Sequence, residues 1–260
     1  MTHKMLRISR IINEAKDIKS FVFEHDLKAK PGQFVILWIP GLDEKPFGVS
    51  YQDKNKFAIT VSKVGEFTKR LFKSKKGDLV GIKGPFGNGF DLDGRRIALV
   101  GGGYGTAPLA FLADEAVKRK IKVDFIIGAK NKDYLLYLKR FENTKVKLHI
   151  ATDDGSHGIK GFTTDLLAGL MNKRIDKIYT CGPEIMMKYV LKIANARNIP
   201  VELNLERYMK CGAGLCGQCC VDPTGWRVCV EGPVFNKEQI EQISEFAEYK
   251  REKSGKKVKL

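Results

Sequence analysis

The sequence predicts a β plus α/β protein, in which an N-terminal antiparallel barrel precedes a parallel-sheet domain and a cysteine-rich loop region. Short runs of alternating apolar and polar residues fill positions 5 to 83, as expected of a small antiparallel barrel or sandwich. From Arg96 onward, continuous apolar strands alternate with helical segments, which indicates a parallel sheet. Four closely spaced cysteines follow this sheet. We expect boundaries at 1–92 for the barrel, 93–205 for the α/β domain, 206–235 for the cysteine loops and 236–260 for a C-terminal helix and basic tail.

The N-terminal runs predict at least five barrel strands. Turn signals at Lys30–Gly32 and Lys76–Asp78 fall between runs, and only Glu66–Lys73 has a helical pattern. The predicted strands cover residues 5–11, 20–23, 33–39, 56–61 and 78–82.

The second half has the alternation of strand and helix that builds a parallel sheet. The apolar strand Ile97–Val100 runs into a glycine loop and then into an amphipathic helix over Ala107–Lys118. In such sheets, ligands bind in the crevice outside the carboxyl ends of the strands. Further strands are predicted at 123–127, 146–150 and 177–180, with helices between them, at Glu184–Arg197 and at Lys237–Tyr249, and a frayed basic tail from Lys250.

Composition excludes several classes of protein. The 260 residues are 43% apolar, which is ample for real cores, and no run of eighteen apolar residues exists, so we expect no membrane span. The net charge of +16 would ordinarily suggest nucleic acid as a partner, but the lysines are scattered rather than clustered with aromatic residues. We therefore expect no nucleic-acid binding. Because no apolar signal region opens the sequence, we expect a cytoplasmic location.

Cys211, Cys216, Cys219 and Cys229 have the C-x4-C-x2-C…C spacing of a plant-type 2Fe-2S centre. The intervening glycines lack the Cβ atoms that would keep backbone N–H groups away from the cluster sulfurs. A structural zinc is the first alternative, although zinc is usually held by paired, closely spaced cysteines. Disulfides are the second, although cytosolic thiols are usually reduced. We expect Cys220 to be a bystander and the chain to carry single electrons.

A glycine loop lies between the first parallel strand and its helix, and it contains Gly101, Gly102, Gly103, Gly105 and Thr106. Free N–H groups at such a helix N-terminus can bind a pyrophosphate, although a turn needed only for packing has the same pattern. No acidic residue ends the next strand, where Gly128-Ala-Lys130 stands.

Two further segments follow neighbouring strands at the same sheet edge. Asp153 comes after the third strand, and Cys181, Gly182 and Pro183 come after the next. Alone, each segment is compatible with an ordinary turn, and a lone cysteine is most often a small buried residue with a packing role only. Together they predict one ligand crevice.

The barrel carries a weaker signal for phosphate. Lys45–Gly48 lies on or before a strand, and Gly65–Thr68 opens the single helix of this region. The helix start could hold a phosphate group paired with Lys45. A plain turn followed by a capping threonine is the alternative.

Three segments, Cys181–Met187, Glu206–Cys219 and Val228–Phe235, give the chain a specific resemblance to a known family. The chain resembles the ferredoxin reductase superfamily, and within it the electron-transfer subunits of NAD-linked dihydroorotate dehydrogenases. This resemblance implies FAD on the barrel, NAD on the parallel sheet and a 2Fe-2S cluster in the C-terminal loops. Within the ligand crevice at the sheet edge, we expect Cys181 to be the catalytic residue.

The resemblance places FAD against three barrel segments. Where the family has Arg-Pro-x-Ser, this chain has Lys45 and Gly48, so it lacks both the arginine on the pyrophosphate and the serine near flavin N5. Lysine is a non-bidentate anchor, which predicts a weaker grip on FAD. Ser50 or a backbone N–H is a candidate substitute for the missing hydroxyl. The three segments are Lys45, Pro46, Phe47 and Gly48, then Thr60, Val61 and Ser62, then Phe67 and Thr68.

The resemblance further implies a route for electrons in pyrimidine biosynthesis, from an FMN-containing catalytic subunit through 2Fe-2S and FAD to NAD+, within a heterotetramer. Nicotinamide exchanges two electrons and the cluster one, so FAD is the converter. The predicted regions use the whole chain, so we expect dihydroorotate to be oxidised on the partner, which the cluster loop should face. The alternatives are the small subunit of a ferredoxin:NADP oxidoreductase or sulfide dehydrogenase, and a flavin-free iron-sulfur regulator.

Overall fold

The computed structural model describes residues 2–260, and its N-terminal part is a closed antiparallel barrel. The strands close in the order β1-β2-β5-β4-β3-β6, which leaves no open sheet edge. The helix α1 (Glu66–Leu71) ends two residues before the predicted Lys73. The strands are β1 (Lys4–Ala15), β2 (Ile18–Phe23), β3 (Phe34–Ile39), β4 (Asp43–Gln52), β5 (Phe57–Ser62) and β6 (Leu79–Phe86).

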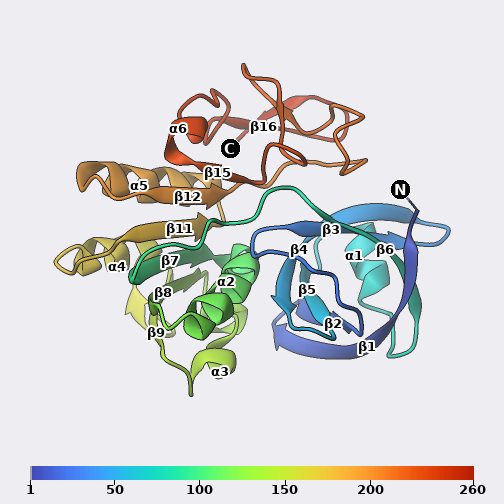
Figure 1. Ribbon diagram of the computed structural model, residues 1–260, viewed down its shortest axis with the longest axis horizontal. Coiled ribbons are helices and arrows are strands. Elements are labelled where there is room, and N and C mark those ends of the chain that lie inside the picture. Colours follow the sequence, from blue (N-terminus) through green and yellow to red (C-terminus); the bar gives the residue numbers. More distant parts are fainter. Residues whose placement is uncertain (1) are drawn as a thin grey trace.

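The second domain is a seven-stranded sheet beside the barrel (Figure 1). Its order is β10-β9-β8-β7-β11-β12-β15, and all neighbours are parallel except β15, which runs antiparallel to β12. The predicted parallel sheet is therefore confirmed. The strands are β7 (Arg96–Gly102), β8 (Lys122–Ala129), β9 (Val146–Thr152), β10 (Ile159–Lys160), β11 (Lys177–Cys181), β12 (Val201–Asn204) and β15 (Val234–Asn236).

Helices cover both faces of this sheet because its strands are apolar on both sides. Ile97 and Leu99 of β7 pack on the face covered by α2, whereas Ala98 and Val100 pack on the face covered by α4 and α5. Helix α2 also packs against β4 of the barrel. The helical elements are η1 (Gly103–Gly105), α2 (Thr106–Lys118), η2 (Lys132–Tyr134), α3 (Leu138–Phe141), α4 (Thr163–Leu170) and α5 (Glu184–Ala196).

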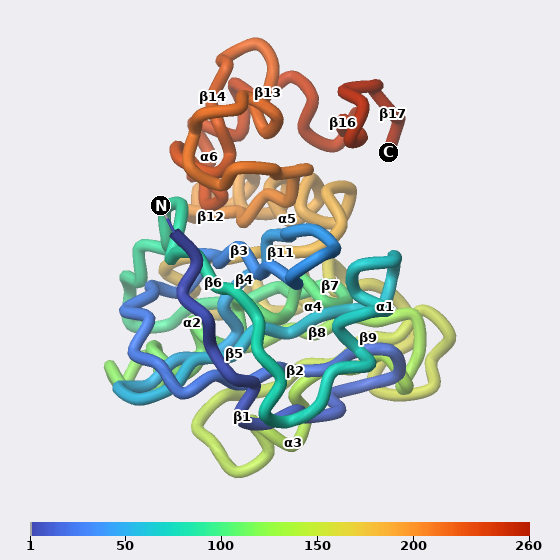
Figure 2. Tube along the Cα trace, turned by 90° about the vertical axis from the view of Figure 1, so that its right-hand side faces the viewer, coloured from blue at the N-terminus to red at the C-terminus, as the bar shows by residue number. Residues whose placement is uncertain are grey.

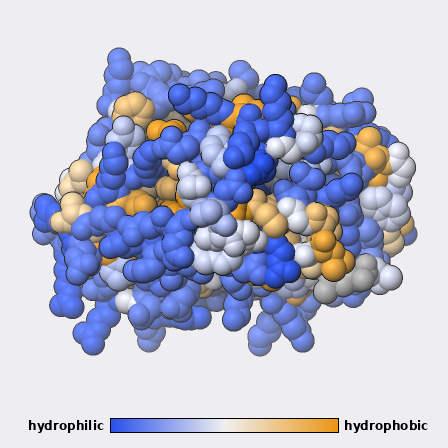
Figure 3. Space-filling model, turned by 90° about the horizontal axis from the view of Figure 1, so that it is seen from above, coloured by the Kyte–Doolittle hydropathy of each residue, from blue (hydrophilic) through white to orange (hydrophobic). Residues whose placement is uncertain are grey.

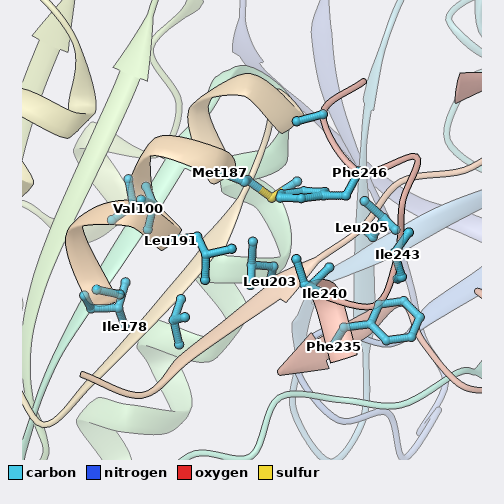
Figure 4. Packing of buried hydrophobic residues seen from close by; sticks show 14 of the residues in the cluster. Val100, Ile178, Met187, Leu191, Leu203, Leu205, Phe235, Ile240, Ile243 and Phe246 are labelled. Carbon is cyan, nitrogen blue, oxygen red and sulfur yellow. The ribbon is translucent and has the colours of Figure 1, made fainter. Parts of the chain in front are cut away.

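The C-terminal region lies across the top of both domains and shares its core with the sheet domain (Figures 1 and 2). Figure 4 shows Ile240, Ile243 and Phe246 beside Met187 and Leu203. The remaining elements are β13 (Cys220–Val221), β14 (Trp226–Arg227), α6 (Lys237–Ile240), β16 (Tyr249–Arg251) and β17 (Lys257–Lys259).

Two predictions for this region were wrong. The helix expected over Lys237–Tyr249 ends at Ile240, because the chain then turns to bring Ile243 and Phe246 into the core. The basic tail is not frayed, since β16 and β17 pair as a hairpin. Asp222 holds this hairpin through Arg251, through Lys257 at 3.3 Å and through the Tyr249 hydroxyl at 2.9 Å.

Buried polar contacts fix the sheet domain against the barrel. The Tyr137 hydroxyl donates to Thr60 Oγ1 at 2.6 Å, and both terminal nitrogens of Arg140 donate to the Ser50 carbonyl at 3.1 Å. Arg140 also pairs with Asp114 of α2. Burial raises the pKa of Tyr137 to about 12, which keeps its hydroxyl a neutral donor. The space between the two domains therefore has fixed walls.

Candidate flavin, nicotinamide and iron-sulfur sites

A cleft of about 270 Å³ lies between the barrel and the sheet domain. The predicted flavin segments and Cys181 face this common space, although they come from strands far apart in the sequence. Lining residues include Pro46, Phe47, Gly48, Thr60, Val61, Ser62, Val64 and Thr68 from the barrel, Tyr104, Ala107, Pro108 and Cys181 from the sheet domain, and Asn204, Leu205, Glu206, Arg207 and Met209 from the segment after β12.

The barrel wall of the cleft is aromatic and supported from behind. Phe47 stacks on the buried Phe67, with ring centroids 6.0 Å apart, so Phe67 supports the wall without lining it. The Thr68 hydroxyl accepts hydrogen bonds from the N–H groups of Val64 at 2.9 Å and Gly65 at 3.0 Å. Thr68 therefore closes the start of α1 from the third helical position, whereas the alternative interpretation expected a threonine at the N-cap, where Gly65 stands.

The surroundings of Gly48 and Ser50 show whether a hydroxyl can face the cleft in place of the family serine. A Cβ atom on Gly48 would meet only Pro108, at 4.0 Å, so a serine would fit there. Ser50 is buried, and its hydroxyl donates to the Ala58 carbonyl and lies 2.9 Å from that of Thr60. Ser50 does not line the cleft, so the suggestion that it supplies the missing hydroxyl is not supported. Residues 48 and 50 would share a face in a regular strand, but the pairing of β4 with β5 is irregular between Val49 and Tyr51, and the Ser50 hydroxyl turns to the Ala58 carbonyl.

Lys45 lies at the edge of the cleft, next to Pro46. Its ammonium forms an ion pair with Asp43 and lies 5.7 Å from the centre of the Tyr208 ring. It is thus near the cleft but outside its lining.

The glycine loop and the Cys181 loop touch backbone to backbone. A Cβ atom on Gly105 would lie 2.6 Å from the Cα of Gly182, and one on Gly102 would lie 2.8 Å from Pro183 Cδ. Gly182 itself has a φ of +151°, a conformation that favours glycine. The glycines of both motifs are therefore required for this approach.

At the carboxyl edge of the sheet, the turn η1 leads straight into α2. The Thr106 N–H already donates to the Gly103 carbonyl and Pro108 has no N–H, so the donors for an anion there come mainly from the glycine loop that precedes the helix. Among residues 2–260, the only buried side-chain N or O atom without a hydrogen-bond partner is Thr106 Oγ1, at the first position of this helix. An anion at this helix start would be held by the dipole and the N–H groups. Thr106, Gly101 and Gly103 thus fit the predicted pyrophosphate site.

Asp153 ends β9 beside the loop that follows β8. Its N–H donates to the Ala129 carbonyl at 3.2 Å, and the next loop is tied in by Lys132 N–H donating to Ser156 Oγ at 2.8 Å. Asp153 is exposed. An exposed acidic side chain, that of Asp153, thus follows β9 next to the end of β8, which has none of its own.

Tyr104 and Glu206 form a hydrogen-bonded pair in the cleft, and sequence reasoning assigned neither a role. Desolvation by the cleft walls raises the pKa of Glu206, although its side chain still faces open space. Burial, and then the Glu206 charge, raise the pKa of Cys181 well above its usual range. Cys181 is therefore a neutral thiol at neutral pH. The one sequence signal for a role of Glu206 was its position, with Arg207, directly after the buried segment Val201–Leu205.

Arg207 joins the cleft to both neighbouring regions through a buried ion-pair cluster. Its guanidinium binds Glu184, the first residue of α5, and donates through Nε to Glu245 Oε1 at 2.7 Å. Glu245 is fully buried, and the second Glu184 oxygen accepts a 3.0 Å bond from the Ala247 N–H. The helix after Cys181 is thereby fixed to the C-terminal region.

The four predicted cluster cysteines lie as two pairs, Cys211 beside Cys216 and Cys219 beside Cys229. Burial by itself would raise the pKa of Cys211. Hydrogen bonds from neighbouring groups, among them the Ala213 N–H at 3.4 Å from the sulfur, outweigh this effect and lower the pKa to about 7. Burial raises the pKa of Cys219 to about 12.

Glycine conformation allows the backbone to approach these sulfurs. Gly214 donates its N–H to Cys229 Sγ at 3.2 Å and has a φ of +76°. Gly212, at +70°, packs against Ile36 of the barrel, where a Cβ atom would lie 2.9 Å from Ile36 Cγ1. The cysteine loop is thus seated on the barrel that forms one wall of the cleft.

The arrangement of thiols fits a dinuclear cluster. The four cysteines lie as two separate pairs, Cys211 with Cys216 and Cys219 with Cys229. A single structural zinc needs four ligands around one point, whereas a 2Fe-2S cluster spreads four thiolates over two irons. All six cysteines are free thiols.

Curated relatives cover nearly the whole chain. It is 50% identical over 253 residues to a probable dihydroorotate dehydrogenase B (NAD(+)), electron transfer subunit, of Methanocaldococcus jannaschii, covering 97% of this chain and 96% of the relative. It is 47% identical over 259 residues to the similarly named subunit of Methanothermobacter thermautotrophicus, covering 98% and 97%. The chain belongs to this family of electron transfer subunits.

Family models match two parts of this electron transfer subunit. The iron-sulfur cluster binding domain of dihydroorotate dehydrogenase B matches residues 206–241, and the oxidoreductase NAD-binding domain matches residues 99–192. The first range holds all four predicted cluster cysteines, and the second holds the glycine loop, Asp153 and Cys181.

Solved structures share the fold. A structure of an NADH-dependent reduced ferredoxin-NADP oxidoreductase superposes with a TM-score of 0.82, at 30% identity over 94% of both chains. Phthalate dioxygenase reductase has a TM-score of 0.63 at 19% identity, covering 84% of this chain and 85% of that one, which shows the fold alone. Among the residues described, no helix has the length and apolarity needed to cross a membrane.

Proposed function

We propose that this protein is the electron-transfer subunit of an NAD-linked dihydroorotate dehydrogenase, and that it passes electrons from an FMN-containing, dihydroorotate-oxidising partner to NAD+. The observation that carries this proposal is the short segment Glu206–Lys210. Glu206 lines the cleft that holds the predicted flavin and nicotinamide residues, and five residues later Cys211 begins the cluster loop. The one-electron and two-electron sites are therefore neighbours.

When bound, FAD converts one-electron exchange with a 2Fe-2S cluster into two-electron exchange with a nicotinamide. Phe47, supported by Phe67, forms the apolar barrel wall for the flavin ring. Cys181 and Glu206 face the same space from the sheet side, where the nicotinamide must enter. The neutral Cys181 thiol packs there without a charge, and Glu206 provides the negative charge that favours a cationic nicotinamide ring.

The dinucleotide follows the carboxyl edge of the sheet in this proposal. Its pyrophosphate lies at the N-terminus of α2, where Thr106 Oγ1 lacks a partner. Its adenosine end reaches Asp153, whose carboxylate suits a ribose 2′-OH and repels a 2′-phosphate. This arrangement supports NAD+ as the acceptor.

The partner faces the cluster loop. Leu215 is 87% exposed between two of the cluster cysteines, and Cys216 beside it is exposed as well. An apolar side chain at the tip of a redox loop is suited to burial against another protein. We place the FMN-containing subunit on this loop.

Co-purification from native extract tests the proposal. We expect a large subunit that contains FMN, and a complex that reduces NAD+ with dihydroorotate. Isolation of a glutamate-synthase-like subunit, with NADPH as the preferred donor, would instead support the ferredoxin:NADP alternative, which the 30% identical solved structure favours. The stoichiometry of the purified complex tests the heterotetramer.

A further inference from the structure

The cleft between the two domains has room for only part of FAD. Its volume of about 270 Å³ is at the small end for a drug-sized ligand, and FAD is larger than such a ligand. The flavin ring fills the part lined by Phe47 and Gly48. The adenosine half must therefore lie outside the cleft.

A second hollow lies beside this cleft. It has a volume of about 950 Å³ and is bounded on one side by Tyr208 and on the other by the turn of the β16–β17 hairpin. Glu206 and Arg207 line both spaces, so the two are adjacent. We name this hollow, between Tyr208 and residues 250–254, the hairpin groove.

The hairpin groove has an aromatic side chain at its inner end. The half-buried Tyr208 ring lies on its wall, and the Lys45 ammonium lies 5.7 Å from the ring centre. An aromatic face of this kind stacks with a nucleobase. Because Lys45 adjoins Pro46 of the cleft lining, a ligand that passes from the cleft into the groove passes this cation.

The far wall of the hairpin groove has more basic than acidic side chains, with Lys250, Arg251 and Lys253 against Glu252. Lys250 and Lys253 line it, and within residues 2–260 neither lysine belongs to an ion pair. The other basic side chains of the groove, Arg207 and Arg251, are held by Glu245 and Asp222. Two lysines are thus available for the phosphates of a ligand.

We infer that the hairpin groove holds the adenosine half of FAD, with the adenine on Tyr208 and the phosphates near Lys45, Lys250 and Lys253. This inference rests on the proposed FAD site in the cleft. It gives the C-terminal hairpin, which the sequence pattern had indicated to be a solvated tail, a direct part in binding the cofactor. It also supplies further contacts where the family arginine is replaced by Lys45.

Comparing FAD with FMN isolates the adenosine half, because FMN carries the same flavin without the adenosine. We would strip the whole chain of flavin and measure the Kd of each by quenching of flavin fluorescence. Wild type should bind FAD more tightly than FMN. Tyr208→Ala should raise the Kd for FAD about tenfold, in line with the loss of one stacked base, and leave the Kd for FMN unchanged. Tyr208→Phe keeps the aromatic ring and should retain the wild-type ratio of the two Kd values, for FAD and for FMN.

Charge variants provide a second measurement that does not alter the core. Lys253→Gln should weaken FAD about threefold and FMN, which keeps only one of the two phosphates, by less, whereas the control Lys259→Gln, on β17 outside the groove, should change neither. A ratio of FAD to FMN affinity that stays constant in Tyr208→Ala and Lys253→Gln would overturn the inference while leaving the flavin site intact. Failure of wild type to bind either flavin would remove the proposed FAD site as well. A higher KM for NADH with an unchanged flavin ratio would assign the groove to the nicotinamide dinucleotide and also overturn the inference.

Discussion

The Tyr104 hydroxyl donates a hydrogen bond to Glu206 Oε2 at 3.0 Å, across the cleft from the glycine loop to the segment that leads into the cluster cysteines. This bond stabilises the ionised carboxylate and so opposes the effect of desolvation, which raises the pKa of Glu206. The nicotinamide site therefore contains a carboxylate whose charge depends on Tyr104.

The first prediction concerns pH. As pH falls through the raised pKa of Glu206, the carboxylate takes up a proton and the charge that favours NAD+ is lost, so kcat/KM for NAD+ should fall. Glu206→Gln should lower kcat/KM for NAD+ about tenfold, equivalent to about 1.4 kcal/mol. It should also abolish the acidic limb of the pH profile, which is the fall of kcat/KM at low pH. Tyr104→Phe should move the limb to higher pH, because the carboxylate loses a donor. A limb that persists in Glu206→Gln would show that another group titrates.

The second prediction concerns the cluster. Cys216→Ser should lose the cluster and keep FAD, because the flavin wall is formed by barrel strands that do not include the cysteine loop. Iron and flavin content of the purified variant measure this. The neighbouring Cys220→Ser should keep both and is the matched control. Retention of about two irons per chain in Cys216→Ser would contradict the ligand assignment.

The third prediction concerns the anchor of FAD. Lys45→Arg should retain more flavin than wild type through dilution and gel filtration, because a guanidinium can hold Asp43 and a phosphate together. Lys45→Met should retain less. If both variants match wild type, Lys45 is not a phosphate anchor.

The fourth prediction concerns the choice of dinucleotide. Diaphorase assays should give at least about tenfold higher kcat/KM for NADH than for NADPH. Asp153→Ala should narrow this ratio, since it removes the acidic group at the end of β9. Asp154→Ala is the control, because its carboxylate accepts a hydrogen bond from the Ser156 N–H. A preference for NADPH would reverse the assignment.

The fifth prediction concerns the buried ion pairs of Arg207. Arg207→Met should lower the free energy of unfolding by about 3–5 kcal/mol, because Glu184 and Glu245 would be left without their shared cation. Lys188 lies on α5, as Glu184 does, and forms an exposed ion pair with Glu248. Lys188→Met should lower the free energy of unfolding by no more than about 1 kcal/mol. Urea unfolding compares the two. Equal costs would mean that the buried cluster adds little to stability.

Periodicity predicted most of the fold because it reports which side of a strand or helix is buried. It failed for β4, whose charged residues, Pro46 and Gly48 interrupt the alternation. It also failed for the β16–β17 hairpin, because Asp222, distant in sequence, holds that hairpin in place.

The candidate site was predictable where one motif supplies the chemistry, as for Cys211 and Cys216. The role of Glu206 was not predictable. It reaches the cleft only because β12 lies beside β11 in the sheet, and this order is set by packing rather than by any local pattern. Ser50 was one of two candidates for the missing hydroxyl, and the irregular pairing that turns it away from the cleft cannot be read from its spacing to Gly48.

The cysteine loops leave the sheet domain at the end of β12 and return to it at β15, and these two strands are hydrogen-bonded neighbours, with Leu203 opposite Phe235. The ends of the loop region are thus held together by the backbone of the sheet. Newly made protein can complete its sheet and its flavin cleft before any iron arrives, since none of the four predicted cluster cysteines lies in a strand of that sheet or lines the cleft. Cluster insertion would then be the final step of maturation, and cells starved of iron would accumulate a folded, flavin-loaded form ready to receive it.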